Sequence, residues 1–393
     1  MSNVRAFVSK RVVDGYRMIH DGVVVIADGK IQAVGAQKTT RIPEGAEVVD
    51  CGNNVVSPGL IDIHIHGCKG QSANESLENT LQLCEFVAQY GTTSILPTVN
   101  STDGVRYVYE ASEIQKKEGY KGAAIPGSHM EGPFLSPKEL PGRPEVDAHL
   151  LPPTIEKFDE FWEASHGQIK MVDIGIDRPG AFELTRYMRD KGVVVSIAHS
   201  KSGYDLMMEA MEHGVTHATH LYNVMTGLHH RRPGITGACL TNDMINCELI
   251  CDTLHVHPAA MEVAIRCKGY DRIAMITDLS MAGLPDGDYE RPGGTTITVK
   301  DGIARMKGSD PSQDNTMAGS CITQNVGVRN VHKVLGHPIE AAIRMATISP
   351  AKMMKIDSFT GSLEVGKDAD ITVWDDDFNA LMTIVKGTTV YQK

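Results

Sequence analysis

Apolar and polar positions near both ends of the chain follow the short alternation that is typical of β-strands. Residues 23–26 and 31–34 are two such runs, and Asp28-Gly29 lies between them. An Asp-Gly pair between apolar runs favours a tight hairpin. Similar runs occupy residues 370–374 and 381–391. Because chain ends often lie close together, we expect residues 1–56 and 357–393 to form one small β-sandwich domain.

The middle of the chain, residues 57–356, alternates between strand-like and helix-like patterns. Helical spacing of apolar residues, followed each time by a glycine that favours a left-handed C-cap, occurs at 77–90, 181–191, 204–213 and 259–268. The strand-like runs are 60–66, 93–99, 123–131, 170–176, 193–199, 216–222, 246–255 and 272–278. Eight strands that alternate with helices predict a (β/α)8 barrel.

Composition and charge exclude several classes of function. The net charge of −11 over 393 residues argues against a nucleic-acid partner or an anionic membrane surface, since either favours clustered Lys and Arg. The eight cysteines contain no Cys-x-x-Cys pair, which is typical of a reducing compartment. The N-terminal residues lack the apolar core of a signal peptide, and no apolar run is long enough to span a bilayer. We therefore expect a cytoplasmic protein.

Histidines and carboxylates stand at the ends of the predicted barrel strands, where such barrels carry their active sites. A single histidine at a strand end is more often an ordinary core residue. Here, however, six strands converge on one rim, with His64, His66, Glu131, His199, His220, Asp252, His255 and Asp278. Imidazoles and carboxylates gathered in this way predict a site for one or two divalent metal ions.

The order His-x-His, Glu, His, His and Asp on successive strands resembles the amidohydrolase superfamily. Many members carry a carbamylated Lys at the end of the fourth strand, but residues 170–177 offer no Lys at that end, and Glu131 replaces it as the acidic ligand. With the motifs Thr-His-Leu-Tyr-Asn at 219–223 and Thr-Asp at 277–278, this variation is similar to the family of N-acetylglucosamine-6-phosphate deacetylases. The resemblance covers essentially the whole chain.

The resemblance implies metal-dependent hydrolysis of the acetamide of N-acetylglucosamine 6-phosphate, which yields glucosamine 6-phosphate and acetate. It assigns the principal metal to Glu131, His199 and His220, a second ion to His64 and His66, and the role of catalytic acid and base to Asp278. Zinc is the expected ion, and iron, manganese and cobalt suit the same ligands. The implied substrate contacts are Gly142, Arg143, Asn223, Val224, Arg231, His255, Met317, Ala318 and Gly319. The resemblance also implies a homodimer in which Arg231 reaches the neighbouring subunit's site to meet the phosphate.

Three positions depart from the usual pattern of that family. Arg143 stands where His or Gln is usual, Val224 where Ala is usual, and Arg232 where an acidic residue is common. These changes spare the metal ligands but touch sugar recognition. The identity of the substrate therefore stays open: it could also be a different N-acetylhexosamine phosphate, such as the galactosamine epimer, or another amidohydrolase substrate. The chain retains every metal ligand and the catalytic acid and base that the resemblance implies, which argues against a non-catalytic scaffold.

Overall fold

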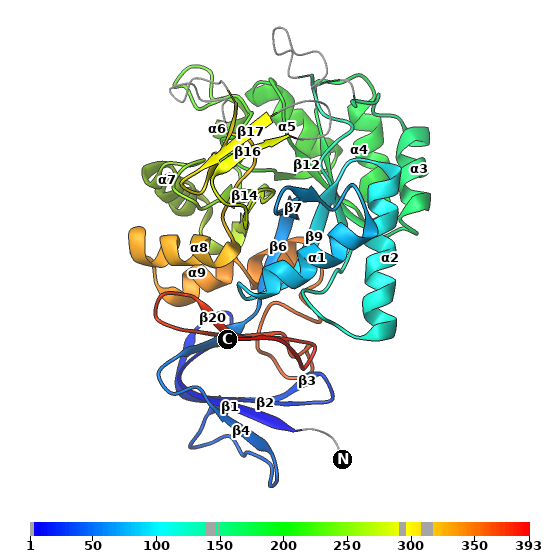
Figure 1. Cartoon of the computed structure of the whole chain (residues 1–393). Helices are drawn as coiled ribbons and strands as arrows, with labels where there is room; N and C mark the ends of the chain where they lie inside the picture. Colours follow the sequence, from blue (N-terminus) through cyan, green and yellow to red (C-terminus); the bar gives the residue numbers. More distant parts are fainter. Residues whose placement is uncertain (1–3, 138–146, 148, 291–295, 308–316) are drawn as a thin grey trace.

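The computed structural model describes residues 4–137, 147, 149–290, 296–307 and 317–393. Two sheets organise this part of the chain: a parallel barrel from the middle of the sequence and a sheet that both termini build beneath it (Figure 1). The predicted fold class is thereby confirmed.

The barrel consists of eight parallel strands that follow one another in chain order around the sheet. They are β6 (Leu60–Ile65), β9 (Thr92–Val99), β10 (Ser128–Met130), β11 (Ile169–Ile174), β12 (Val194–Ile197), β13 (Val215–Ala218), β14 (Asn246–Ile250) and β15 (Ile273–Ile276). The first and last strands meet just beyond β15, where the amide of Asp278 donates to the carbonyl of His64 at 2.9 Å. Nearly every residue of these strands is buried, as expected where helices cover a parallel sheet.

Helices alternate with the barrel strands and surround them (Figure 1). They are α1 (Leu77–Ala88), α2 (Thr102–Glu118), α3 (Ile155–Ala164), α4 (Ala181–Asp190), α5 (Tyr204–His213), α6 (Gly234–Thr241), α7 (Pro258–Lys268), α8 (Gln324–Arg329), α9 (Ile339–Met345) and α10 (Ile348–Met353). The four glycines predicted to end helices, Gly91, Gly192, Gly214 and Gly269, all have positive φ. None of the helices in the described residues is long and apolar enough to cross a membrane.

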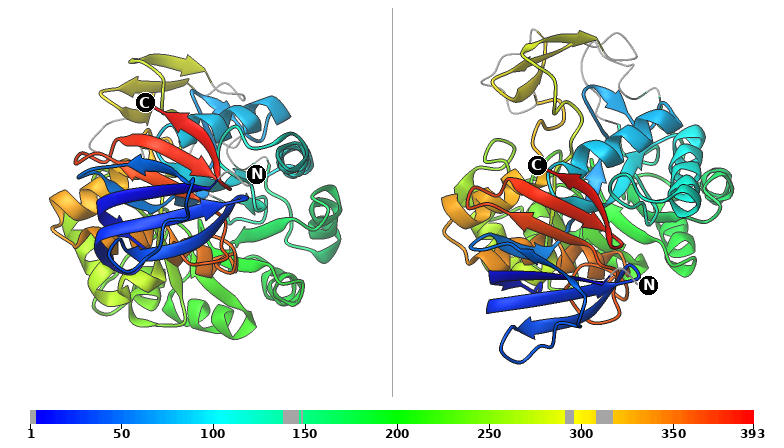
Figure 2. Two further views of the ribbon diagram at one scale, coloured as in Figure 1. Left: turned by 90° about the horizontal axis from the view of Figure 1, so that it is seen from below. Right: turned by 60° about the horizontal axis from the view of Figure 1, so that its bottom comes forward.

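Two regions differ from the pattern-based expectation. The strand predicted at 123–131 is regular only in β10, because Pro126 has no amide proton to contribute to the ladder. After β15 the chain adds an unpredicted antiparallel sheet of β16 (Gly287–Glu290), β17 (Thr296–Lys300) and β18 (Ile303–Met306). Figure 2 shows this sheet projecting away from the barrel. Its return, marked by the bridge between Arg305 and Met317, brings residues 317–319 back to the barrel rim.

The sheet built by both termini has the order β21-β20-β19-β5-β1-β2-β3, with β4 beside β1. Its strands are β1 (Arg5–Val13), β2 (Met18–Ala27), β3 (Lys30–Ala36), β4 (Glu47–Asp50), β5 (Val55–Pro58), β19 (Ile371–Trp374), β20 (Ala380–Val385) and β21 (Thr388–Gln392). The predicted hairpin is confirmed, since β2 and β3 pair across Asp28 and Gly29, both at positive φ. Strand β5 spans the predicted domain boundary at residues 56 and 57, and the division into domains stays a prediction.

Trp374 packs this sheet against the barrel. Trp374 in β19 is fully buried, and its indole donates to the hydroxyl of Ser57 at 2.8 Å. Gly91, between α1 and β9, lies so close that a Cβ atom there would be 2.0 Å from the indole ring. The turn therefore requires glycine for two reasons, its positive φ and this close approach.

Candidate metal centre

Three of the predicted site residues lie just past the ends of their strands in the left-handed backbone region. The φ angles of His199, His220 and Asp278 are 44°, 36° and 51°. Residues other than glycine rarely adopt this conformation, which persists where the surrounding structure enforces it, often at functional sites. At Asp278, for example, the carbonyl accepts from the amide of Ser320 at 2.8 Å.

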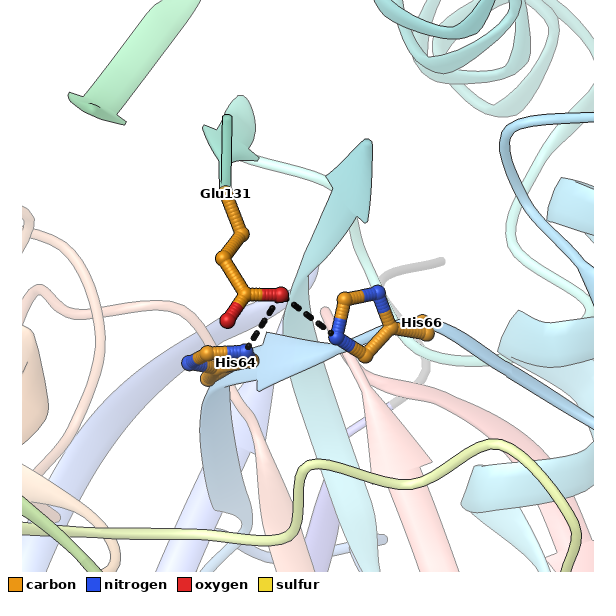
Figure 3. A group of neighbouring side chains, drawn as sticks. All are labelled: His64, His66 and Glu131. Carbon is orange, nitrogen blue, oxygen red and sulfur yellow. Dashed lines mark ion pairs between the residues drawn. The ribbon is translucent and has the colours of Figure 1, made fainter. Parts of the chain in front are cut away.

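Glu131 lies at the centre of the cluster, and its two carboxylate oxygens face different histidine pairs. Oε1 is 2.9 Å from Nε2 of His199 and 3.1 Å from Nε2 of His220. Oε2 is 3.1 Å from Nε2 of His66 and 3.8 Å from Nε2 of His64. Figure 3 shows the rings of His64 and His66 approaching the same oxygen of this carboxylate. Two groups of possible metal ligands therefore share one glutamate.

The spacing of these atoms fits bound cations. The Nε2 atoms of His199 and His220 are 3.1 Å apart while both face one oxygen of Glu131. Ligands of a tetrahedral ion lie about 3.3 Å from one another when each is about 2.0–2.1 Å from the metal. On the other side, Nε2 of His64 is buried and makes no hydrogen bond within the described part of the chain. A carboxylate with two imidazoles on either side is a donor set that suits Zn, Fe, Mn or Co.

Asp278 lies next to the histidine pair of the first strand. Its Oδ1 is 3.2 Å from Nε2 of His66 and 3.8 Å from Nε2 of His64. Burial would raise the pKa of Asp278, but the hydrogen bond from His66 and the charges of both rings lower it to about 2. Burial would lower the pKa of His66, yet its bonds to Asp278 and Glu131 raise it to about 9. At neutral pH, Asp278 is therefore a carboxylate, whose side chain is still 18% exposed.

Buried carboxylates lie behind this ring of ligands. Asp62, on β6, accepts the hydroxyl of Thr277 at 2.6 Å, and burial raises its pKa to about 7 despite that bond. Glu248, on β14, lies 2.8 Å from Nδ1 of His64. Asp173, on β11, lies 3.1 Å from Nε2 of His129. Sequence reasoning did not select Glu248 or Asp173, although a carboxylate inside an otherwise apolar barrel strand was a usable signal.

His129 lies on β10, two residues before Glu131. The structure buries it fully and places its ring 4.7 Å from the His64 ring, measured between centroids. Its Nδ1 donates to the carbonyl of Ile63 at 2.8 Å. The residue therefore packs against His64, one of the predicted metal ligands.

Three of the predicted substrate residues lie in the segment after β13. Asn223 is partly buried, and its backbone amide donates to the carbonyl of His220 at 2.9 Å. This bond holds Asn223 close to His220, a predicted metal ligand. Val224 is 53% exposed and has positive φ. Arg231 is exposed on a turn closed by His229 and Arg232. The exposed side chains of Val224 and Arg231 can thus meet a molecule outside the barrel, whereas the side-chain amide of Asn223 donates to the carbonyl of His220 at 3.2 Å.

The other predicted substrate residues come from two further parts of the chain. His255 follows β14, and its Nδ1 is 2.6 Å from Oδ2 of Asp252. Met317, Ala318 and Gly319 follow the added sheet, and a Cβ atom at Gly319 would be 2.5 Å from the Ser280 hydroxyl, beside Asp278. Gly142 and Arg143 lie outside the described residues.

Comparison with known proteins places this site in a family. Residues 55–390 match the model of the amidohydrolase family. The chain belongs to this family. It is 33% identical over 387 residues to the N-acetylglucosamine-6-phosphate deacetylase of Bacillus subtilis (strain 168), covering 97% of this chain and 95% of that protein. It is 30% identical to the N-acetylgalactosamine-6-phosphate deacetylase of Escherichia coli O157:H7, covering 96% and 97%.

Solved structures of the same family share the whole architecture. The N-acetylglucosamine-6-phosphate deacetylase of Pasteurella multocida is 30% identical and superposes with a TM-score of 0.86, covering 98% of this chain and 99% of that one. A mutant of the Mycobacterium smegmatis enzyme, solved in complex with N-acetyl-D-glucosamine 6-phosphate, is 26% identical with a TM-score of 0.87 and covers 99% and 100%. The resemblance read from the sequence is confirmed.

Proposed function

We propose that this protein hydrolyses the acetamide of N-acetylglucosamine 6-phosphate to glucosamine 6-phosphate and acetate. One observation carries the proposal: a half-buried glutamate shared by two histidine pairs lies beside an ionised aspartate at the catalytic end of a barrel. The near full-length similarity to deacetylases of this substrate supports the choice of substrate. Retention of every ligand argues against a scaffold.

The proposed metal ligands are divided by the two oxygens of Glu131. His199 and His220 would hold the principal ion with Oε1, and His64 and His66 a second ion with Oε2. A divalent ion, with zinc expected, supplies a Lewis acid that acidifies water and polarises the acetamide carbonyl. The residues themselves orient that chemistry, since each ring presents Nε2 to the carboxylate.

Asp278 is the group that moves protons in this proposal. Its carboxylate is ionised at neutral pH and can accept a proton from the attacking water. As the C–N bond breaks, the same group returns that proton to the departing nitrogen, because an amine anion is a poor leaving group. Because Asp278 lies beside both rings of the first strand, the proposed proton transfer would take place next to the second histidine pair.

The substrate would lie over the rim, where the predicted contacts gather. We propose that Asn223, Val224, His255 and residues 317–319 contact the sugar and its phosphate, with Gly142 and Arg143. We also propose a homodimer in which Arg231 meets the phosphate in the neighbouring site. The exposure of Arg231 and the planar fork of its guanidinium, which binds phosphate bidentately, support this role.

The galactosamine epimer is the second candidate substrate. The relative from Escherichia coli O157:H7 that bears the galactosamine name supports it, as does Val224, which adds bulk beside the sugar where alanine is usual. The glucosamine phosphate is favoured because several relatives over nearly the full length carry that name.

Acetate release from a panel of N-acetylated sugars tests this proposal. Chelated protein is reloaded with Zn²⁺, Fe²⁺, Mn²⁺ or Co²⁺ and mixed with the N-acetylated glucosamine and galactosamine, each with and without the 6-phosphate. We expect the highest kcat/KM for the glucosamine 6-phosphate derivative. Equal turnover of the unphosphorylated sugars would contradict the phosphate requirement, and full activity after removal of metal would contradict the metal centre.

Two further features belong with this proposal. The residues before 57 and after 356 would form the small domain and the residues between them the catalytic barrel. A cytoplasmic location is supported by the thiols, because all eight cysteines are unpaired and six of them are buried.

A further inference from the structure

We infer that Glu248 is a positioning residue that fixes the His64 ring and thereby sets the affinity of the second ion position. This inference rests on the proposed metal centre and extends it to a residue that no ligand assignment includes. Glu248 comes from β14, on the far side of the barrel from Glu131, and contacts the Nδ1 edge of the His64 ring, opposite the Nε2 atom that would bind the ion.

The contact between Glu248 and His64 determines which ring nitrogen can bind a metal. Oε2 of Glu248 is 2.8 Å from Nδ1 of His64, and an ionised carboxylate only accepts hydrogen bonds. When the ring is neutral, as it must be to bind a metal ion, Nδ1 therefore carries the proton and the lone pair lies on Nε2. That atom is buried between Glu131 and Asp278, 3.8 Å from each, and hydrogen-bonds to neither.

The same carboxylate reaches the other histidine pair. Oε2 of Glu248 also accepts the backbone amide of His220, at the longer distance of 3.3 Å. One side chain thus links a ligand of the second ion directly and a ligand of the principal ion through its backbone. The shorter contact and the free lone pair both concern His64, so we expect removal of the charge to weaken the second ion much more than the principal one.

A buried metal site formed by Glu248 itself explains the geometry less well. His64, His129 and Glu248 do present ligand atoms close together. However, Nδ1 of His129 donates to the carbonyl of Ile63, and Nδ1 of His64 already faces Glu248. Neither nitrogen has a lone pair to offer. The group therefore supports the metal centre and does not hold an ion of its own.

The test is a Zn²⁺ titration of chelated protein, followed by calorimetry, with the wild type, Glu248→Gln, His64→Gln and the double variant. Glutamine keeps the size of the side chain and removes its charge. We expect two binding steps in the wild type and one in His64→Gln. In Glu248→Gln the weaker step should lose about 10–100-fold in affinity, as is usual when a carboxylate behind a metal-bound histidine is removed. The stronger step should stay within about twofold.

The double variant separates positioning from a general effect on the fold. If Glu248 acts through His64, then Glu248→Gln changes no affinity further once His64 is glutamine. Asp173→Asn is the matched control, because Asp173 is equally buried in the barrel but contacts His129 and Thr219 and no proposed ligand side chain. It should retain both steps.

If Glu248→Gln does not fold, histidine-selective ¹⁵N NMR of the wild type answers the same question. The signals of the His64 ring are those that are missing from the spectrum of His64→Gln. This ring should keep its Nδ1 proton in metal-free and in Zn²⁺-loaded protein. Three results would overturn the inference. The His64 ring could lose its Nδ1 proton on loading, Glu248→Gln could leave both affinities unchanged, or the wild type could bind only one ion. Normal binding without acetate release would instead contradict the proposed substrate and leave Glu248 in its role.

Discussion

His217 makes a sharp prediction about acid stability that is independent of the metal ligands. It lies on β13 with 3% of its surface exposed. Its Nδ1 is 2.8 Å from the Thr216 hydroxyl, and Nε2 is 3.3 Å from the Asn246 amide. Burial, together with the charges of His129 and Lys355, lowers the pKa of His217 to about 3. The folded protein therefore holds this ring neutral.

The sign and size of the effect follow from linkage. The unfolded ring has a pKa of about 6.5, so on acidification the unfolded state takes up the proton first. The stability due to the neutral ring is complete above pH 6.5 and is lost as the pH falls towards 3. Most of the loss occurs between pH 6.5 and pH 5, a span of about 1.5 pH units at about 1.4 kcal/mol per unit. Between pH 7.5 and pH 5 the loss of stability is therefore about 2 kcal/mol. That figure hardly depends on the folded pKa as long as it stays below about 4.

The assay compares the wild type with His217→Gln by urea unfolding at pH 7.5 and pH 5. Chelated protein is used throughout, and coincident unfolding and refolding curves justify a two-state treatment. Other groups titrate in both proteins and cancel in the difference. We expect the variant, which cannot take up this proton, to lose about 2 kcal/mol less than the wild type between the two pH values. Equal losses in both proteins would refute the reasoning.

Three further predictions concern the active site and the junction of the two sheets. Asp278→Asn should lower kcat for acetate release by about 100- to 10,000-fold because it removes the proton carrier, with metal content by mass spectrometry as the control; unchanged turnover would contradict the mechanism. Asp252→Asn should raise KM about tenfold, with a smaller change in kcat, because it replaces the carboxylate that lies 2.6 Å from the His255 ring. An unchanged KM in steady-state kinetics would show that this contact does not orient the ring for the substrate. Gly91→Ala should lower the free energy of unfolding by about 2–4 kcal/mol, from the positive φ and the clash with Trp374, and an unchanged melting temperature would exclude that clash.

The fold could be read from the sequence because its main signals are local. Strand β9 (Thr92–Val99) begins one residue before the predicted 93–99, and helix α5 has the predicted bounds, 204–213. The glycines at helix ends, such as Gly214, report a backbone conformation directly. The sheet β16–β18 was not predicted, because short strands that pair only with one another leave a weak pattern, and its small core depends on contacts with the rim.

The candidate site was predicted from one rule, that the active site of such a barrel lies at the C-terminal ends of its strands. The rule places the ends of parallel strands on one rim, which is sufficient to gather His199, His220 and Asp278. It says nothing of the interior, where the contact between Glu248 and His64 joins residues 184 positions apart. Nor does it show the left-handed backbone at the strand ends, because His and Asp, although enriched in that region, adopt other conformations far more often.

The order of strands around the barrel explains why one glutamate can serve two histidine pairs. Strand β10, which ends at Met130 just before Glu131, lies between β6 on one side and β12 and β13 on the other. A carboxylate from that position has one oxygen for each side, and the observed contacts divide in this way. Because the barrel closes, β15 is the other neighbour of β6, which brings Asp278 next to His66 and away from the Oε1 side. The proposed proton carrier, Asp278, therefore lies beside His64 and His66, the proposed ligands of the second ion.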